Sequence, residues 1–242
     1  MSGVIVREVL QPSDRSKLDP GDDRSFYDTP RFVKHVDDPF VAQVTELYRQ
    51  KILPGGDVLD LMSSWVSHLP QEVQYGRVVG HGLNAQELAR NPAFKGEFFV
   101  RNLNQEPSGW ALKDQSMDAV LCCCSVQYLE QPEVVFAEIY RVLKPGGVCI
   151  FTFSNRMFYT KAIQAWRDTT GYARCQMVKQ YFMAVEGFTA PEALTKVEPK
   201  GNAASSAGFV LPGALKAVMK LFERSGSDPF YAVISYRNFA RD

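Results

Sequence analysis

The stretch that decides the fold of this chain is SMDAVLCCCSVQYLEQPEVVFAEIYRVLKPGGVCIFTFSN, residues 116–155. An apolar run at 119–124 has the length of a buried strand, and it is followed by a helical pattern at 132–143 with an apolar stripe. The KPGG turn ends that helix, because either glycine can adopt the left-handed conformation, and 148–153 is again apolar. A strand, a helix and a second strand in this order indicate a βαβ unit with parallel strands.

The same alternation extends on both sides of this unit. An aspartate followed by proline, Asp38 and Pro39, predicts the start of a helix that ends before Pro54. Further strands are expected at 58–61, 77–80, 98–102, 194–198 and 230–236, and further helices at 85–90, 161–167, 173–184 and 214–224. The pattern therefore predicts a doubly wound, mainly parallel α/β sheet flanked by helices.

Composition excludes several kinds of partner. The 242 residues suit one α/β domain, and 27 basic against 27 acidic side chains give no charge excess for nucleic acid or an anionic membrane. A small, weakly charged substrate or a protein surface is expected. The N-terminus lacks a signal-peptide pattern, which predicts a cytoplasmic protein. The five cysteines form neither a disulfide framework nor a zinc motif.

A second stretch, VLDLMSSWVSHLP at 58–70, begins as a strand and runs into a turn. Nucleotide-binding turns carry glycines there, whereas this chain has Met62, Ser64 and Val66. Together with 116–155, the order of elements resembles the small-molecule branch of the class I S-adenosylmethionine-dependent methyltransferases over about 58–153. The resemblance implies a Rossmann-like fold, S-adenosylmethionine as cofactor and methyl transfer to a small-molecule acceptor.

The resemblance also implies roles for particular residues. Asp60 matches the acid beside the ammonium group of the cofactor, Gly82 falls where the family has a ribose-binding carboxylate, and Asn102 replaces an adenine-binding aspartate. The loss of a carboxylate that accepts two hydrogen bonds weakens binding by roughly 2 to 4 kcal/mol if the ribose goes unpaired. The full predicted cofactor site is Asp60, Met62, Ser63, Ser64, Gly82, Leu83, Asn102, Leu103, Asn104, Cys124 and Ser125.

The candidates for catalysis are His35 as a general base and Tyr128 as the group that orients the acceptor. The segment with Tyr27, Arg31 and His35 precedes the first helix, and is either a lid over the site or a surface loop. The adjacent thiols at 122–124 are either small buried strand residues or reactive groups.

In the predicted domain organisation, 1–25 is a loosely ordered N-terminal arm and 26–242 is the methyltransferase-like domain. Within that domain, 26–56 is a helical lid, 57–155 the cofactor-binding core and 156–242 the substrate side with an insertion. An alternative function is a non-catalytic binding or regulatory module on the same fold. A third hypothesis, a nicotinamide-dependent oxidoreductase, is disfavoured because the chain lacks G-x-G-x-x-G.

Overall fold

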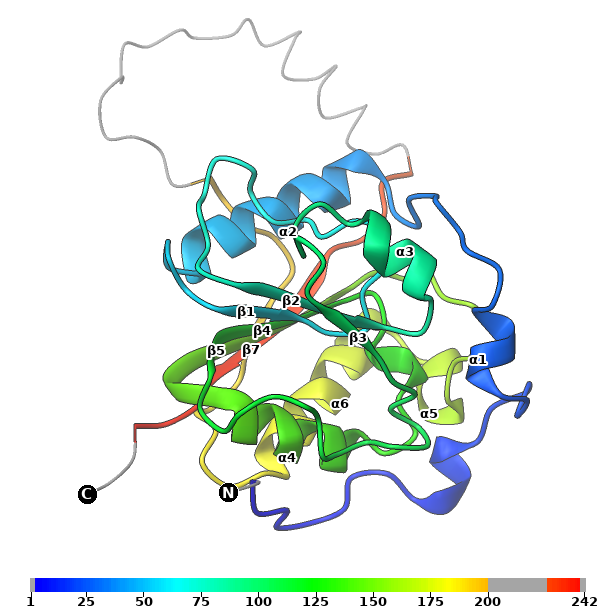
Figure 1. Ribbon diagram of the computed structural model, residues 1–242. Helices are drawn as coiled ribbons and strands as arrows, with labels where there is room; N and C mark the ends of the chain where they lie inside the picture. The colour runs from blue at the N-terminus through cyan, green and yellow to red at the C-terminus, as the bar shows by residue number, and fades with distance from the viewer. Residues whose placement is uncertain (1–2, 200–225, 240–242) are drawn as a thin grey trace, which may run out of the picture.

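A seven-stranded sheet forms the middle layer of the computed structural model, which describes residues 3–199 and 226–239 (Figure 1). Its strands are β1 Val58–Asp60, β2 Val78–Gly82, β3 Phe98–Val100, β4 Met117–Cys123, β5 Leu143–Phe153, β6 Glu192–Leu194 and β7 Tyr231–Tyr236. They lie in the order β3-β2-β1-β4-β5-β7-β6, and β7 runs antiparallel to both of its neighbours. The predicted doubly wound, mainly parallel sheet is confirmed.

Helices cover both faces of the sheet. Figure 1 shows α2 (Asp38–Lys51) and α3 (Ala85–Arg90) on one side, and α4 (Pro132–Val142), α5 (Gln164–Arg167) and α6 (Gly171–Met183) on the other. The predicted cap of the first long helix is wrong by one residue, because the Asp37 carboxylate accepts a hydrogen bond from the Phe40 amide. Asp38 lies inside the first turn, followed by Pro39, whose missing amide hydrogen costs nothing there.

Each face of the sheet has its own apolar core. Between the sheet and α4, the Phe136 ring stacks on Phe151 with centroids 4.7 Å apart, and both side chains are fully buried. On the opposite face, Phe40, Val44 and Leu47 of α2 are also fully buried. Burial of one large apolar side chain contributes about 1.5–3 kcal/mol to the free energy of unfolding, so these two apolar layers stabilise the sheet from both faces.

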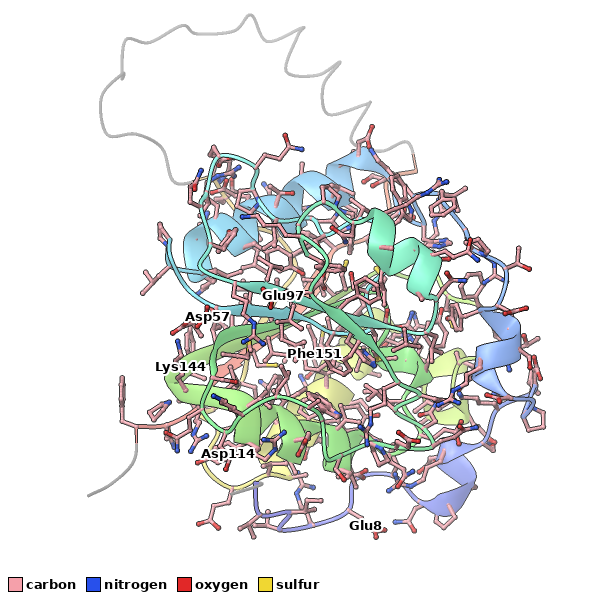
Figure 2. All side chains as sticks on the ribbon, in the orientation of Figure 1. Glu8, Asp57, Glu97, Asp114, Lys144 and Phe151 are labelled. Carbon is pink, nitrogen blue, oxygen red and sulfur yellow. The ribbon has the colours of Figure 1, made fainter. Side chains whose placement is uncertain are left out.

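The KPGG turn lies within a strand rather than before one. β5 begins at Leu143, which pairs with Met117, and the register then skips to Val148 opposite Ala119. Gly146 takes a left-handed φ of 78°. Lys144 in this bulge bonds Asp57 at 3.2 Å and Asp118 at 2.6 Å, so it ties the starts of β1 and β4 together (Figure 2).

The first crossover is unusual because it contains no helix. Residues 61–77 connect β1 to β2 through turns and bends alone. This loop is fixed against α3, where Asn91 donates from Nδ2 to the Ser64 carbonyl at 3.0 Å and to the Ser67 hydroxyl at 3.1 Å. The backbone that follows β1 is therefore positioned by side chains instead of by a helix.

Residues 3–25, which the sequence predicts as a loosely ordered arm, make defined contacts with the rest of the chain. Ile5 pairs with Val185, Leu10 is buried, and the arm passes below α4 and rises to α1 (Asp23–Phe26) (Figure 1). Arg15 in the 3₁₀ helix Pro12–Arg15 donates to both carboxylate oxygens of Glu133 at 3.0 Å. Polar residues of this segment, whose composition suggested disorder, thus form paired contacts with the domain.

Smaller differences concern the C-terminal part. The helix predicted at 161–167 is shorter, and the strand predicted at 194–198 lies earlier, as β6. The predicted loop at 201–208 and helix at 214–224 lie outside the described residues. In the described ranges, no helix combines the length and the apolar character that a membrane crossing requires.

Candidate functional site

A cavity of about 430 Å³ opens at the carboxyl ends of β1, β2 and β4. Strand order reverses between β1 and β4, and ligands of open α/β sheets bind at such a reversal. The cavity brings together both predicted catalytic residues, His35 and Tyr128, and the whole predicted cofactor set. That set is Asp60, Met62, Ser63, Ser64, Gly82, Leu83, Asn102, Leu103, Asn104, Cys124 and Ser125. The individual roles of these residues remain predictions.

Asp60 supplies a buried carboxylate to the cavity. Its side chain ends β1, is 5% exposed, and accepts hydrogen bonds at Oδ2 from Ser63 at 2.7 Å and from Ser67. Burial raises the pKa of Asp60 to about 6, although the two serine hydroxyls oppose that shift. Within the described part of the chain, no lysine or arginine forms an ion pair with it. The site thus holds a negative charge that a cationic ligand can neutralise.

His81, which the sequence reasoning did not single out, holds the turn after β1. Its Nδ1 accepts from the Met62 amide at 3.0 Å, while Nε2 lies 2.9 Å from the Arg101 carbonyl oxygen and must carry the proton. Burial lowers the pKa of His81 to about 4, so the ring is neutral at physiological pH. Met62 adopts a left-handed φ of 54°, which costs a non-glycine residue about 1–2 kcal/mol.

Gly82 lies directly beneath this turn. A Cβ atom at position 82 would be 2.5 Å from the Ser63 carbonyl oxygen, closer than any real contact. The Ser63 amide also donates to the His81 carbonyl at 2.6 Å, which fixes the close approach. Glycine is therefore required here by space, and the carboxylate that the family has at this position does not fit.

Glu87 is a second residue that the sequence reasoning missed. Asn84 caps α3 by accepting from the amides of Gln86 and Glu87, and this places Glu87 in the first turn facing the cavity. The Glu87 carboxylate accepts from the Ser64 hydroxyl at 2.5 Å and from the Arg31 amide at 2.6 Å. It joins the turn after β1 to the segment that precedes α2. The acid three residues after the capping position was the available signal.

Two asparagines form the wall beyond β3. The Asn102 Oδ1 accepts from the Asn104 amide at 3.0 Å, and Asn104 donates from Nδ2 to Asp23 at 2.8 Å and to the Tyr128 carbonyl at 3.0 Å. On the β4 side, Ser125 donates to the Met62 carbonyl at 3.0 Å. Polar groups from three strand ends are thus linked around one opening.

An aromatic corner closes the other side of the cavity. It consists of Phe26, Tyr27, His35, Tyr128 and Phe158, with the Phe158 ring 5.1 Å from Phe26 and 5.5 Å from His35. The Arg31 guanidinium lies 4.5 Å from the Phe26 ring centroid and 5.4 Å from that of Phe158. This contact of rings from the N-terminal segment with Phe158 favours the lid interpretation over a free surface loop.

The two predicted catalytic side chains have suitable protonation states. Partial burial, with the positive charge of Arg31 nearby, lowers the pKa of His35, so its imidazole is neutral at pH 7 and able to accept a proton. Burial raises the pKa of Tyr128 to about 12. The Tyr128 hydroxyl oxygen accepts from the Phe158 amide at 2.9 Å, which leaves its own proton for another partner.

The sheet order, the reversal at β1 and β4 and the cavity at this point define a Rossmann-like fold of the methyltransferase type. A family profile described as "Methyltransferase domain" matches residues 64–151. A malonyl-[acyl-carrier protein] O-methyltransferase from Marinomonas sp. (strain MWYL1) is 34% identical over 55 residues, which are 23% of this chain and 20% of that relative. The chain therefore spans about a fifth of the curated relative it matches.

Solved structures agree on the fold. A chain from a complex between the Haloferax volcanii Trm112 methyltransferase activator and a methyltransferase is similar at a TM-score of 0.56 and 14% identity, over 91% of this chain and 95% of that chain. An S-adenosylmethionine-dependent methyltransferase from Mesorhizobium loti is similar at 0.51 and 15% identity, over 81% and 98%. At this level of identity the two structures show the fold alone, a Rossmann-like methyltransferase fold, in which this chain has a turn without glycine after its first strand.

Proposed function

We propose that this protein binds S-adenosylmethionine in the cavity and transfers its methyl group to a small-molecule acceptor. The observation that carries the proposal is the buried Asp60 carboxylate, which forms no ion pair with a lysine or an arginine in the described residues. An uncompensated buried charge is costly unless a ligand pairs with it. The cofactor carries an ammonium group and a sulfonium, and either one would pair with Asp60.

The residues present fit the cofactor in most respects. A cavity of about 430 Å³ lies within the usual range of small-molecule sites, roughly 300–1,000 Å³. Its lining combines apolar side chains such as Leu103 with the amide groups of Asn102 and Asn104, which suit an adenine ring. The lining differs from the family pattern where the ribose would lie, because Gly82 offers no carboxylate there. Glu87 is the nearest acid along the chain that lines the same cavity.

When bound, the cofactor supplies an electrophilic methyl group on its sulfonium. The chain's own residues would align the acceptor and exclude water, which is the main requirement of such a displacement. The aromatic corner would shield the reacting atoms, and Tyr128 would donate its hydroxyl proton to the acceptor. His35 would accept the proton that an oxygen or nitrogen acceptor releases. The name of the Marinomonas relative describes an O-methyltransferase and supports an oxygen acceptor.

Calorimetry with S-adenosylmethionine and S-adenosylhomocysteine tests the binding step. We expect both to bind the wild type, and Asp60→Asn to weaken binding at least about tenfold, because a buried charge pair is lost. Release of S-adenosylhomocysteine across a panel of small acceptors tests transfer. His35→Ala and Tyr128→Phe are expected to lower turnover without changing cofactor affinity. Tyr172→Phe, an exposed tyrosine on α6, is the matched control.

A second candidate function is a non-catalytic binding or regulatory module. It is favoured by the Ser63 carbonyl oxygen, which covers the position where the family places its ribose-binding acid. If neither ligand gives heat at protein concentrations well above the expected dissociation constant, the binding proposal fails and the module becomes the better assignment.

A further inference from the structure

Arg31 lines the cavity as a cation without an acidic partner. Its guanidinium lies 4.5 Å from the ring centroid of Phe26, 5.7 Å from that of Tyr27 and 5.4 Å from that of Phe158. Nη2 donates to the Phe26 carbonyl at 3.0 Å, whereas Nη1 is buried and has no hydrogen-bond partner. Within the residues that the structure describes, no aspartate or glutamate forms an ion pair with Arg31. A buried donor on a charged group is costly when it has no acceptor, so Nη1 indicates a site for an anionic ligand.

The other lysines and arginines that line the cavity are already paired with acids. Their ion pairs are Lys34 with Asp38 at 2.8 Å, Arg101 with Glu106 at 3.4 Å, Arg156 with Asp228 at 2.6 Å and Lys161 with Asp19 at 3.1 Å. Glu87 contacts the Arg31 segment, but its oxygens are bonded to the Arg31 amide at 2.6 Å and to the Ser64 hydroxyl at 2.5 Å. The guanidinium of Arg31 is thus the basic group of the cavity that is open to an anion.

Arg31 lies beside the groups proposed for catalysis. The Phe158 ring centroid is 5.4 Å from the Arg31 guanidinium, 5.5 Å from the His35 ring and 6.2 Å from the Tyr128 ring. Asp60, in contrast, belongs to the end of β1, where the cationic cofactor is proposed to bind. The cavity therefore has a negative charge at the end of β1 and a positive charge at the aromatic corner, where the acceptor is expected.

We propose that Arg31 is a specificity-determining residue that binds a carboxylate of the methyl acceptor, and that the acceptor is a planar, apolar acid. This inference rests on the proposed function and names its substrate class. A guanidinium matches a carboxylate with two parallel hydrogen bonds, and the surrounding rings suit a planar apolar body. Rotation of the Arg31 side chain would bring Nη1 to the ligand and would give up one hydrogen bond, that to the Phe26 carbonyl.

The carboxylate anchors the acceptor and is not the methylated group. A carboxylate has no proton to lose at neutral pH, so it has no use for a base such as His35. The methylated atom is then a hydroxyl oxygen or an amine nitrogen of the same molecule, next to His35 and Tyr128. The methyl group leaves the sulfonium sulfur for that atom, which loses its proton to His35.

The charge of the corner favours a carboxylate over a phosphate. A phosphate monoester carries nearly two negative charges at neutral pH, whereas Arg31 supplies one positive charge. Lys34 and Arg156 are already paired with Asp38 and Asp228, so they add little. A second negative charge on the ligand would also be repelled by the Glu87 carboxylate, which bonds the Arg31 amide.

Ligand-observed NMR titrations of the wild type with matched acids and amides test the preference. The probes are benzoate, 4-hydroxybenzoate and cinnamate, each against its primary amide, which has nearly the same shape and no charge. At least one acid is expected to bind about tenfold more tightly than its amide, because a charge-assisted pair with Arg31 is gained. Benzenephosphonate at about pH 8 should bind more weakly than benzoate, because of its second charge. Equal affinities within every acid and amide pair, or tighter binding of the phosphonate, would overturn the proposal without reference to any variant.

Variants assign the preference to Arg31. Arg31→Gln is expected to weaken binding of the preferred acid about tenfold and to leave its amide unchanged. Arg90→Gln is the matched control, because the Arg90 guanidinium lies 4.1 Å from the ring centroid of the neighbouring Phe32 but does not line the cavity. If Arg156→Gln removed the preference and Arg31→Gln kept it, the assignment to Arg31 would be wrong.

Calorimetry with S-adenosylhomocysteine separates this inference from the proposed function. Arg31→Gln should bind S-adenosylhomocysteine as tightly as the wild type, which also shows that the variant is folded. Cofactor binding without any preference for acids would contradict the inference and leave the methyltransferase proposal intact. A preference for acids without cofactor binding would support Arg31 as an acid-binding residue and contradict methyl transfer.

Discussion

Asp60→Asn is expected to stabilise the unliganded protein at neutral pH while it weakens cofactor binding. The substitution keeps the size of the side chain, and the amide oxygen still accepts from the Ser63 and Ser67 hydroxyls. What it removes is a charge that the folded state holds at 5% exposure without a lysine or arginine partner in the described residues. The residue would thus be retained for binding at the expense of stability.

The size of the expected gain in stability follows from the pKa of Asp60. Burial raises the pKa of Asp60 from 3.8 to about 6, a difference of about 2 units, and each unit is worth about 1.4 kcal/mol. The folded state binds the proton more tightly, so the stability that Asp60 contributes below its unfolded pKa is lost as pH rises through about 6. Above that pH the loss is about 3 kcal/mol. After about 1 kcal/mol for weaker bonds to an amide, the variant should gain roughly 2 kcal/mol.

His81 obscures this effect in the wild type. Burial lowers its pKa from 6.5 to about 4, so its contribution is present above pH 6.5 and is lost as pH falls through about 4. The slopes of Asp60 and His81 have opposite signs in nearly the same pH window and largely cancel. Asp60→Asn should therefore expose the His81 slope, and the variant should lose stability more steeply than the wild type between about pH 6.5 and pH 4.

Urea unfolding of both proteins from about pH 4 to pH 8 measures the difference. Asp118→Asn is the control, because Asp118 is a partly exposed acid that pairs with Lys144, and its loss should cost no more than about 1 kcal/mol. A variant that is less stable than the wild type at neutral pH, with a parallel pH curve, would refute the reasoning. Asp60 would then be a structural acceptor for the serines and not an uncompensated charge.

Three further predictions use the same unfolding assay. Gly82→Ala should lower the free energy of unfolding by about 1–3 kcal/mol and disturb ligand binding, because its methyl group would meet the backbone of Ser63. Gly96→Ala has open space around it, so it should lower stability by about 1–2 kcal/mol, through its left-handed φ alone, and leave binding intact. In the Asp60→Asn background, His81→Gln should abolish the rise in stability between about pH 4 and pH 6.5, and an unchanged curve would count against a neutral buried ring. Arg15→Ala should cost about 3–5 kcal/mol, because it leaves the buried Glu133 carboxylate without its cationic partner, and it should expose the N-terminal arm to protease. Resistance equal to the wild type would mean that other contacts hold the arm, such as the Val9 and Leu10 amides that donate to Glu133.

The sheet could be predicted from the sequence because its signals are local. The alternation of apolar runs and helical stripes fixed the element types, and all residues predicted for the site line one cavity. The arm at 3–25 could not be predicted, since the Arg15–Glu133 pair joins residues 118 positions apart, and composition carries no information about partners so distant. Asp37 replaced Asp38 as the helix cap because adjacent acids differ in no local property that decides which one caps.

The sequence favoured small buried strand residues over reactive thiols for the cysteine run at 122–124, because the run lies within a short apolar strand pattern. His81 was missed because a histidine within an apolar strand gives no sign that both of its ring nitrogens are bonded to backbone.

The departures from the family pattern are best understood as one structural change. A crossover without a helix offers no helix N-terminus after β1, so the amide of Met62 is satisfied by His81 and the amide of Ser63 by the backbone of β2. That pairing brings the Ser63 carbonyl over β2, which requires glycine at position 82 and excludes the acid. Because these features depend on one another, restoring a single family residue should not restore the family's binding mode. Gly82→Asp, in particular, should lose stability and gain no affinity for S-adenosylmethionine, and tighter binding by that variant would show that the turn moves aside for the ligand.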